Sequence, residues 1–342
     1  MQGEKRMQYL GCWWRVLGHY RHKYFCLLLL LLFLSCSACC FRGPDGKDEP
    51  VVTSGSYEIT DEAGRKLHFA GKPQRIVSLT YGTDEILTAL VDIKRIVAYC
   101  KWAGDQEITF ITPEQAAIVG HKLADNNVEA VVALQPDLIV LSESSPEGAV
   151  KAFTDIGLRV YVASSPKTYA GMQRKIKGLA AAVGEEKQGQ IILETMNKNL
   201  AAAQDPLRQL KPEQERVAMA FSFIGAIGRQ GQLLDEIFKL AHVKNGAVLA
   251  GLVQGAPLLS KEKIVAVNPQ VMLLPTWNFE TPENNVQKYA DQIRHDPALQ
   301  QIRAVKDNKL VFVSDRYRYV ASQHLTDSVA AVAKAVYPEL YQ

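Results

Sequence analysis

Aromatic and basic side chains that could hold a small molecule follow several apolar runs of the sequence. They are Tyr81, Trp102, Arg229, Trp277, Arg316 and Tyr317, accompanied by Ser142, Glu143, Phe223 and Asn278. Aromatic faces stack on flat ligands, and planar guanidinium groups pair with acid groups. In open α/β sheets, ligands bind beyond the carboxyl ends of the strands. If the apolar runs are such strands, these residues predict a site for a large, flat or carboxylate-bearing ligand, although core packing explains any single aromatic equally well.

Three residues could also contact a metal. His121 follows Gly120 in a loop, and its neutral imidazole could coordinate the metal of a bound complex. The alternative is a histidine that only faces solvent. Tyr317 and Tyr319 could supply a phenolate or a hydrogen bond. We expect these two tyrosines at the end of a strand, with only one of them facing the site.

Motifs of common enzymes and metal carriers are missing. The sequence contains no GxSxG, HExxH or P-loop pattern. The five histidines beyond residue 40 are scattered, at positions 68, 121, 242, 295 and 324. A carrier of a bare metal ion would need several converging His or Asp ligands. The sequence therefore argues against an enzyme and against a carrier of free metal ions.

The N-terminus has the pattern of an export signal. Basic residues precede an apolar run at 25–34, which is short for a membrane span but suits a signal-peptide core. Cys36 follows Leu32-Phe33-Leu34-Ser35 and resembles the lipidated cysteine of a bacterial lipobox, and Cys39 is a second possible position. We therefore predict a signal peptide over residues 1–35 and an exported, lipid-anchored protein. A plain secretory signal or a single anchor helix is the alternative.

The charge and the cysteine content limit the class of protein that residues 36–342 can form. Without residues 1–35 the chain has 34 Lys and Arg against 35 Asp and Glu, so the overall charge of +3 belongs to the signal. No basic patch indicates a nucleic-acid partner. Only Cys100 lies beyond residue 40, which excludes a disulfide framework. The body must therefore fold on its hydrophobic core, and we expect a monomer.

Short apolar runs alternate with helical patterns in two stretches of the chain. The expected strands are 75–79, 95–99, 138–141, 159–162, 217–221, 271–274 and 310–313. Runs that are apolar on both faces and separated by helices are typical of parallel α/β sheets. Between the two stretches, residues 169–210 look helical, with a break at Gly184. The fold class is thus α/β, with two lobes that each hold a mainly parallel sheet and are joined by a single long helix.

The predicted boundaries follow from this alternation and from a Gly- and Pro-rich stretch after the signal. They are a flexible tether over 36–55, an N-terminal lobe over 56–184, a connecting helix over 185–210 and a C-terminal lobe over 211–342. An internal repeat supports the division. Asp-Glu-Ile occurs at 84–86 and 235–237, and a glutamate stands seven residues before a proline at Glu129 and Glu262. Convergence of two ordinary βαβ units is the alternative explanation.

Several motifs in order resemble one protein family. They are ITDEAGR at 59–65, KPQRIVSL at 72–79, TDEIL at 83–87, NVE at 127–129 and LQPDLI at 134–139. This pattern is similar to the substrate-binding proteins of bacterial ABC importers for iron complexes and cobalamin, over nearly all of residues 56–342. The resemblance implies two lobes bridged by one rigid helix. It also implies a ligand, such as a ferric siderophore, haem or cobalamin, held between them, with no cofactor of its own.

The same resemblance implies partners and roles for single residues. In the family, one glutamate on each lobe docks onto arginines of the membrane permease, and Glu129 and Glu262 match those positions. Their simpler explanation is a favourable acidic residue in the first turn of each helix. Some haem-binding relatives place a ligating tyrosine near the position of His121, with slightly different spacing. We therefore expect a permease and its ATPase as partners, while a sensor lipoprotein or a tetrapyrrole or metal-chelate enzyme on the same fold are the alternatives.

Overall fold

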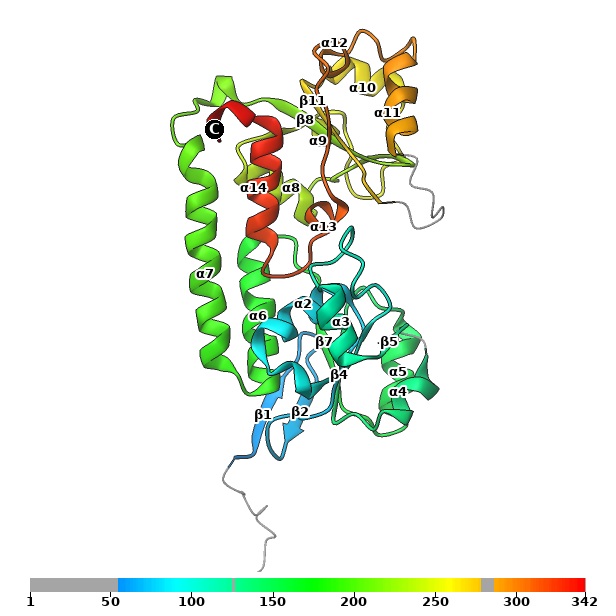
Figure 1. Cartoon of the computed structure of the whole chain (residues 1–342), viewed down its shortest axis with the longest axis vertical. Helices are drawn as coiled ribbons and strands as arrows, with labels where there is room; N and C mark the ends of the chain where they lie inside the picture. Colours follow the sequence, from blue (N-terminus) through cyan, green and yellow to red (C-terminus); the bar gives the residue numbers. More distant parts are fainter. Residues whose placement is uncertain (1–54, 125–126, 278–285, 342) are drawn as a thin grey trace, which may run out of the picture. The chain divides into compact units, whose positions relative to one another are not determined.

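The computed structural model describes residues 55–124, 127–277 and 286–341. The predicted signal peptide, both candidate lipidation cysteines, nearly all of the tether, and Asn278 lie outside these residues. The described chain forms two lobes with a layer of long helices beside them (Figure 1).

The N-terminal lobe is built on five described strands, all parallel, in the order β5-β4-β3-β6-β7. Their bounds are β3 Ile76–Ser78, β4 Ile96–Cys100, β5 Lys122–Leu123, β6 Leu138–Ser142 and β7 Val160–Ala163. The helices of this lobe are α2 Tyr81–Leu90, α3 Pro113–Val119, α4 Val128–Ala133 and α5 Glu147–Asp155. A hairpin of β1 Tyr57–Thr60 and β2 Lys66–Phe69 precedes the sheet. The continuous apolar runs form strands because both faces of this sheet are covered by other elements.

The C-terminal lobe repeats this plan. Its parallel strands have the order β10-β8-β11-β12, and a short strand β9 pairs antiparallel with β8. The strands are β8 Val217–Ser222, β9 Gly225–Ile227, β10 Lys244–Asn245, β11 Val271–Leu274 and β12 Leu310–Phe312. The helices are α8 Leu233–Leu240, α9 Gly246–Leu249, α10 Lys261–Val267, α11 Val286–His295, α12 Arg303–Lys306, α13 Asp315–Arg318 and α14 Leu325–Val336. Strands β3, β4, β6 and β7 thus correspond in order to β8, β10, β11 and β12.

A single long helix, α7 Glu186–Gln204, connects the lobes and runs antiparallel to α6 Tyr169–Val183, the last helix of the N-terminal lobe (Figure 1). Helix α6 follows β7 and ends at Gly184, whose positive φ of 71° closes the helix in the left-handed conformation. Helix α7 then leads to β8. It packs against both α6 and α14, as Figure 1 shows.

The hydrophobic core follows the alternation of side chains along the strands. Ile76, Leu138, Ala218 and Leu273 point toward α6, α7 and α14, and they share one cluster that runs through both lobes. The alternate residues of the same strands form a separate cluster in each lobe, under α4 and α5 in one and under α10 and α11 in the other. The shared cluster explains how a single helical layer can support both sheets.

The predicted fold class is therefore confirmed, with one local correction. We expected Tyr317 and Tyr319 at a strand end, but β12 stops at Phe312, and α13 takes Asp315 through Arg318, with Tyr319 as the residue that ends it. The repeat is also visible in the backbone. Gln135 and Asn268 each stand directly before a proline and have φ values of 47° and 51°.

Across 55–124, 127–277 and 286–341, the structure has no helix with the length and apolar character of a membrane span.

Candidate functional site

A pocket of about 290 Å³ lies at the carboxyl ends of the N-terminal strands β3, β4, β5 and β6. Its lining residues are Leu79, Thr80, Tyr81, Cys100, Lys101, Trp102, Leu123, Ala124, Ser144 and Ser145. We call it the N-lobe pocket. Tyr81 and Trp102, both predicted from their place after a strand, are among these residues. The position agrees with the general rule for ligands of open α/β sheets.

Tyr81 contributes a phenol that also bridges the two lobes. It is the first residue of α2, and its hydroxyl donates a hydrogen bond to the carbonyl oxygen of Tyr319 at 2.8 Å. Burial, with a smaller contribution from the nearby Glu85 carboxylate, raises the pKa of Tyr81 well above its usual value. The phenol therefore stays protonated at neutral pH, and its single proton is used in the hydrogen bond to Tyr319.

Hydroxyl groups and one cation form the polar side of the pocket. The Oγ atom of Ser142 lies 3.0 Å from that of Ser144 and 3.1 Å from that of Ser165. The ammonium of Lys101 lies 4.6 Å from the ring centroid of Trp102, a cation–π distance. We predicted Ser142 and Glu143 at this edge of the sheet. The residues that line the pocket are instead the next two in the chain, Ser144 and Ser145.

The wall near Cys100 contains a buried carboxyl group. The backbone N–H of Cys100 donates to Oδ2 of Asp84 at 3.0 Å, and Asp84 is fully buried. Among the described residues, Oδ1 of Asp84 has no hydrogen-bond partner. Burial raises the pKa of the Asp84 carboxyl to about 8, and burial also raises the pKa of the Cys100 thiol well above its usual value. Both groups are therefore neutral at pH 7, and the thiol is a poor nucleophile.

A set of contacts between the lobes lies next to this pocket; we call it the interlobe junction. It joins residues 105–110 of the N-terminal lobe to residues 276–277 and 314–317 of the C-terminal lobe. Trp277 meets Trp102 edge-on, with ring centroids 5.2 Å apart, and donates from Nε1 to Oδ2 of Asp105 at 2.9 Å. Oε2 of Glu107 accepts from Oγ1 of Thr276 at 2.6 Å. Trp277 thus reaches from one lobe to an aromatic wall of the pocket in the other.

Arg316 and Tyr317 lie at the same junction. The guanidinium carbon of Arg316 lies 5.0 Å from the ring centroid of Phe110 and 5.1 Å from that of Tyr317. The backbone N–H of Arg316 donates to the carbonyl oxygen of Glu107 at 2.8 Å. Within the described part of the chain, the buried Nε of Arg316 has no hydrogen-bond partner. The guanidinium therefore lies against two rings, and its Nε–H is a donor without an acceptor among the described residues.

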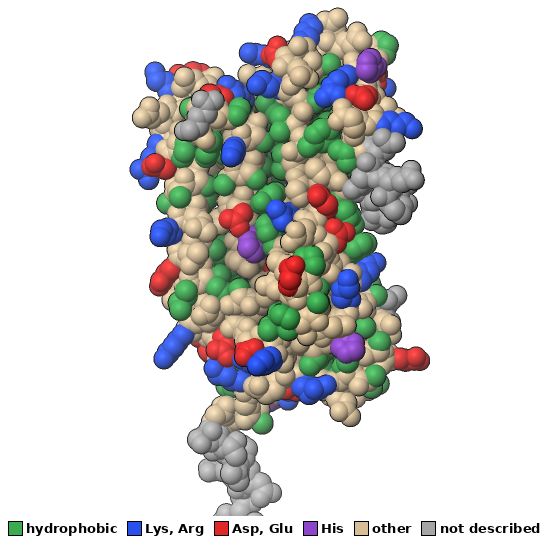
Figure 2. Space-filling view, in the orientation of Figure 1, with side chains coloured by type: hydrophobic (Ala, Val, Ile, Leu, Met, Phe, Trp, Pro, Cys, Tyr) green, Lys and Arg blue, Asp and Glu red, His purple; other side chains and the backbone are tan. Residues whose placement is uncertain are grey.

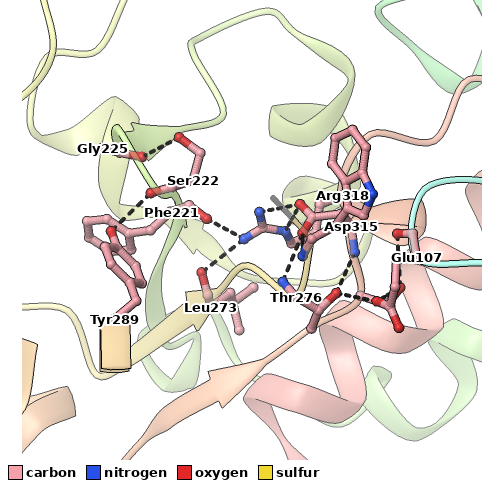
Figure 3. Close-up of polar contacts among 11 residues, drawn as sticks. Glu107, Phe221, Ser222, Gly225, Leu273, Thr276, Tyr289, Asp315 and Arg318 are labelled. Atoms are coloured by element: carbon pink, nitrogen blue, oxygen red, sulfur yellow. Dashed lines mark hydrogen bonds and ion pairs between the residues drawn. The ribbon is translucent and has the colours of Figure 1, made fainter. Parts of the chain in front are cut away.

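A buried ion pair behind the junction was not predicted. Arg318 and Asp315 have side chains that are 0% and 1% exposed, with Nη2 and Oδ1 2.6 Å apart. Arg318 also donates to the carbonyl oxygens of Phe221 and Leu273, at the ends of β8 and β11 (Figure 3). Oδ2 of Asp315 accepts from the backbone N–H groups of residues 276 and 277, at 2.9 and 2.8 Å. The pair therefore fixes the backbone that carries Trp277.

The other predicted site residues lie elsewhere. His121 is exposed, and its backbone carbonyl oxygen accepts a hydrogen bond from the Tyr99 N–H at 3.0 Å. Arg229 donates to the carbonyl oxygens of Val253 and Ala256 at 2.9 and 2.6 Å, so it holds the loop before α10. Phe223 packs against the ring of Tyr289. None of the three is among the residues that line the N-lobe pocket.

The two repeated glutamates occupy matching positions. Glu129 lies in the first turn of α4 and Glu262 in the first turn of α10, and both are exposed. A hydrogen bond from Ser260 lowers the pKa of Glu262 below its usual value. Each helix feeds an equivalent strand, β6 or β11, through a Gln-Pro or Asn-Pro step. The two carboxylates are therefore charged surface groups at equivalent places on the two lobes.

Metal ligation and surface charge complete the description. Among the residues that the structure describes, no group of three or more His, Cys, Asp or Glu side chains is arranged to hold a metal ion. On the face shown in Figure 2, acidic and basic side chains are interspersed over both lobes.

Comparisons with known proteins identify the family of the chain. Residues 76–317 match the family described as periplasmic binding protein. An uncharacterized ABC transporter substrate-binding lipoprotein of Bacillus subtilis, YvrC, is 25% identical over 329 residues, which cover 92% of this chain and 96% of that protein. The Fe(3+) dicitrate-binding periplasmic protein FecB of Escherichia coli is 28% identical over 259 residues, covering 70% of this chain and 77% of FecB.

A solved structure shows the same fold. The molybdate periplasmic binding protein MolA of Haemophilus influenzae, bound to molybdate, superimposes with a TM-score of 0.66 at 20% identity, covering 84% of this chain and 93% of MolA. These relatives are substrate-binding proteins of ABC transporters and not enzymes, as the sequence led us to expect. The chain belongs to the periplasmic binding protein family, in the group whose members serve ABC importers.

Proposed function

We propose that this protein is a lipid-anchored, extracytoplasmic binding protein that captures an iron complex, either a ferric siderophore or haem, or else cobalamin, and delivers it to an ABC importer. The observation that carries the proposal is the N-lobe pocket at the strand ends, with Trp102 and Trp277 meeting beside it from opposite lobes. Aromatic walls suit the flat parts of such ligands, and the Lys101 ammonium and the hydroxyls of Ser144 and Ser145 can donate to their oxygen atoms.

Arg316 adds a basis for recognising acid groups. Its guanidinium lies against the rings of Phe110 and Tyr317, and its buried Nε has no hydrogen-bond partner among the described residues. A buried donor without an acceptor is costly, and a carboxylate or catecholate oxygen would satisfy it. Citrate-based and catecholate siderophores, and the propionates of haem, all carry such oxygens. The relative FecB, which binds Fe(3+) dicitrate by its name, has the same kind of ligand.

The size of the pocket sets a condition on the ligand. Its volume of about 290 Å³ is at the lower end for small-molecule sites, which span roughly 300–1,000 Å³. A compact ferric chelate fits this volume better than a tetrapyrrole does. Haem or cobalamin would need the junction between Trp277 and Asp105 to open, and exposed His121 would have to move to reach a bound metal.

Titration of the intrinsic tryptophan fluorescence tests the proposal, because Trp102 borders the pocket. The panel is ferric dicitrate, a ferric catecholate, haemin, cyanocobalamin and molybdate, with the iron-free chelator or porphyrin as control for the three iron complexes. One metal complex is expected to quench the fluorescence saturably. It should also add about 2.7 kcal/mol of stability at a hundred times its dissociation constant. Trp102→Phe should remove most of the fluorescence change and keep the thermal shift. No response to any metal complex would overturn the proposal.

A small oxyanion is the second candidate ligand. The N-lobe pocket is compact and offers the Lys101 ammonium with the hydroxyls of Ser144 and Ser145. MolA, which was solved with molybdate bound, shares the fold. Binding of molybdate alone, abolished by Lys101→Met, would replace the iron-complex proposal by this one. Binding of a ferric chelate that molybdate does not displace would exclude it.

Delivery and anchoring complete the proposal. The partners are a permease, which Glu129 and Glu262 contact, and its ATPase, with the protein acting as a monomer.

The lipid anchor is on Cys36, or alternatively on Cys39, at the outer face of the cytoplasmic membrane. Radiolabelled palmitate incorporation in cells that carry Cys36→Ser or Cys39→Ser identifies the cysteine. Unchanged labelling in both variants would contradict lipidation at either position.

A further inference from the structure

The repeated Asp-Glu-Ile motif contains two glutamates for which the proposed function has no use. Glu85 is in α2 of the N-terminal lobe, and Glu236 is in the equivalent helix α8 of the C-terminal lobe. Neither lines the N-lobe pocket, and neither is at the predicted permease surface. Each instead contacts a segment that comes from the other lobe.

Glu85 holds the segment that precedes α14. Its side chain is buried, and Oε1 accepts from Thr109 Oγ1 at 2.7 Å and from Phe110 N–H at 2.9 Å. Oε2 accepts from the hydroxyl of Ser322, and its backbone carbonyl accepts from Nε2 of Gln323 at 3.0 Å. Ser322 and Gln323 follow the last strand of the C-terminal lobe and lead directly into α14.

Two neighbours tighten this contact. The buried ammonium of Lys175 donates to the carbonyl oxygen of Ala321 at 2.8 Å. Gly82 lies so close to Ala321 that a Cβ at position 82 would be 2.5 Å from that carbonyl oxygen. The segment 321–323 is therefore packed against α2 and hydrogen-bonded to two helices of the N-terminal lobe.

Glu236 makes the converse contact. Its Oε1 accepts from the backbone N–H of Tyr169 at 3.2 Å. Tyr169 is the first residue of α6, which follows β7, the last strand of the N-terminal lobe. An acidic group at the start of this 15-residue helix also interacts favourably with the helix dipole.

The two contacts are related by the repeat. Helix α6 packs on α2 of its own lobe, and its first residue contacts Glu236 of the other lobe. Helix α14 packs on α8 of its own lobe, and the residues before it contact Glu85 of the other lobe. We propose that Glu85 and Glu236 are a reciprocal pair of positioning residues that fix the angle between the lobes, and through it the distance from Trp277 to the N-lobe pocket.

The native tryptophans provide a readout that needs no ligand. The indoles of Trp102 and Trp277 come from different lobes and are 5.2 Å apart, which is close enough for exciton coupling in circular dichroism. Trp102→Phe identifies the part of the spectrum that belongs to this pair, since the chain has four tryptophans. Hydrogen exchange of the peptides that contain Tyr169 and His324 reports on each contact separately.

The variants are chosen to leave the fold intact. Ser322→Ala removes one hydroxyl from the Glu85 contact, Glu236→Ala removes the acceptor from the start of α6, and Glu236→Gln keeps an acceptor oxygen. Glu194→Ala, at an exposed position of α7, is the matched control. We expect amide hydrogen exchange to be about tenfold faster at the start of the affected helix. The exciton signal should be weaker in Ser322→Ala and in Glu236→Ala, and weakest in their double variant.

Glu236→Gln should restore most of the exciton signal, and Glu194→Ala should leave it unchanged. The melting temperatures of the single variants should stay within a few degrees of the wild-type value. In the double variant, affinity for the ligand should fall by about tenfold, and this affinity measurement alone rests on the proposed function. An unchanged exciton signal in the double variant would overturn the inference. So would a loss of signal that appears only together with loss of far-ultraviolet helix signal, because it would show a purely structural role.

Discussion

Arg318 shows how a single residue organises the C-terminal side of the site. Its guanidinium is completely buried, and it is paired with Asp315 and with carbonyl oxygens at the ends of two strands. Taking two charges out of water is costly, and the pair stabilises a fold only when its remaining hydrogen bonds are satisfied. Here the Asp315 carboxylate uses its second oxygen for the backbone of residues 276 and 277. The pair therefore links the sheet of the lobe to the loop that presents Trp277.

Arg318→Met should be strongly destabilising, because it leaves the Asp315 carboxylate buried without its partner. We expect a loss of about 3–5 kcal/mol in the free energy of unfolding, measured by urea denaturation. Arg208→Met is the control, since Arg208 pairs with Asp205 at the surface, where the side chains are 70% and 66% exposed. The control should cost less than about 1 kcal/mol. Equal costs for the two variants would contradict the role of the buried pair.

Asp84 gives a prediction for pH. Burial raises the pKa of this carboxyl from 3.8 to about 8, so the folded state keeps a proton that the unfolded state loses above pH 4. The stability contributed by this group is therefore greatest below pH 4 and is lost as the pH rises toward 8. Relative to Asp84→Asn, the wild-type protein should lose up to about 1.4 kcal/mol per pH unit in this window. Parallel curves of unfolding free energy against pH for the two proteins would show that Asp84 is not protonated in the folded state.

Some of these residues could be predicted from the sequence, and the reason is local. Tyr81 and Trp102 follow buried strands directly, so the carboxyl-end rule places them at the pocket. Ser144 and Ser145 lie only a few residues beyond the predicted Ser142. Arg318 could not be found in the same way, because the residues that form α13 were expected at the end of a strand. Only a helical turn brings Asp315 and Arg318, three residues apart, to the same side.

At the scale of elements, buried parallel strands were the most predictable part of the molecule. The seven expected strands, observed as β3, β4, β6, β7, β8, β11 and β12, are apolar runs, and their bounds differ from the expected ones by no more than one residue at any end. The two-residue strands β5 and β10 were not expected, because neither is an apolar run. The break at Gly184 between α6 and α7 was equally clear. Contacts between lobes were not predictable. Ser322 and Glu85 are 237 residues apart in sequence, and no local sequence pattern indicates that they pair.

The contact between α2 and the segment before α14 can be tested with one methyl group. Gly82→Ala would place a Cβ 2.5 Å from the carbonyl oxygen of Ala321, so overpacking should cost about 1–3 kcal/mol. Gly148→Ala is the control in α5, where a Cβ meets nothing within 4 Å. There the higher helix propensity of alanine should make the protein more stable by up to about 0.5 kcal/mol. Thermal unfolding measures both, and a stabilising Gly82→Ala would contradict the close approach.

At the scale of the whole molecule, the duplicated plan places one exposed glutamate on each lobe. Two equivalent negative groups suit a partner with two-fold symmetry, because each lobe can then make the same contact. The described structure places Glu129 and Glu262 on equivalent helices, outside the pocket. The permease contact remains a prediction of the sequence.

Glu129→Ala combined with Glu262→Ala should abolish uptake in whole cells and leave ligand affinity within about twofold, because neither side chain lines the pocket. Radiolabelled ligand uptake and fluorescence titration measure the two properties. Glu213→Ala, at another exposed acidic position, is the control and should transport normally. Loss of affinity in the double variant, or normal uptake, would exclude the docking role.

The hold of α2 on residues 321–323 also bears on the order in which the chain can fold. Synthesis proceeds from the N-terminus, and domains generally fold as they emerge. One partner of the buried Glu85 carboxylate, Ser322, lies 237 residues further along the sequence. The N-terminal lobe is therefore made before one of its buried contacts can form, and a chain without residues 321–323 would leave Oε2 of Glu85 without the Ser322 hydroxyl.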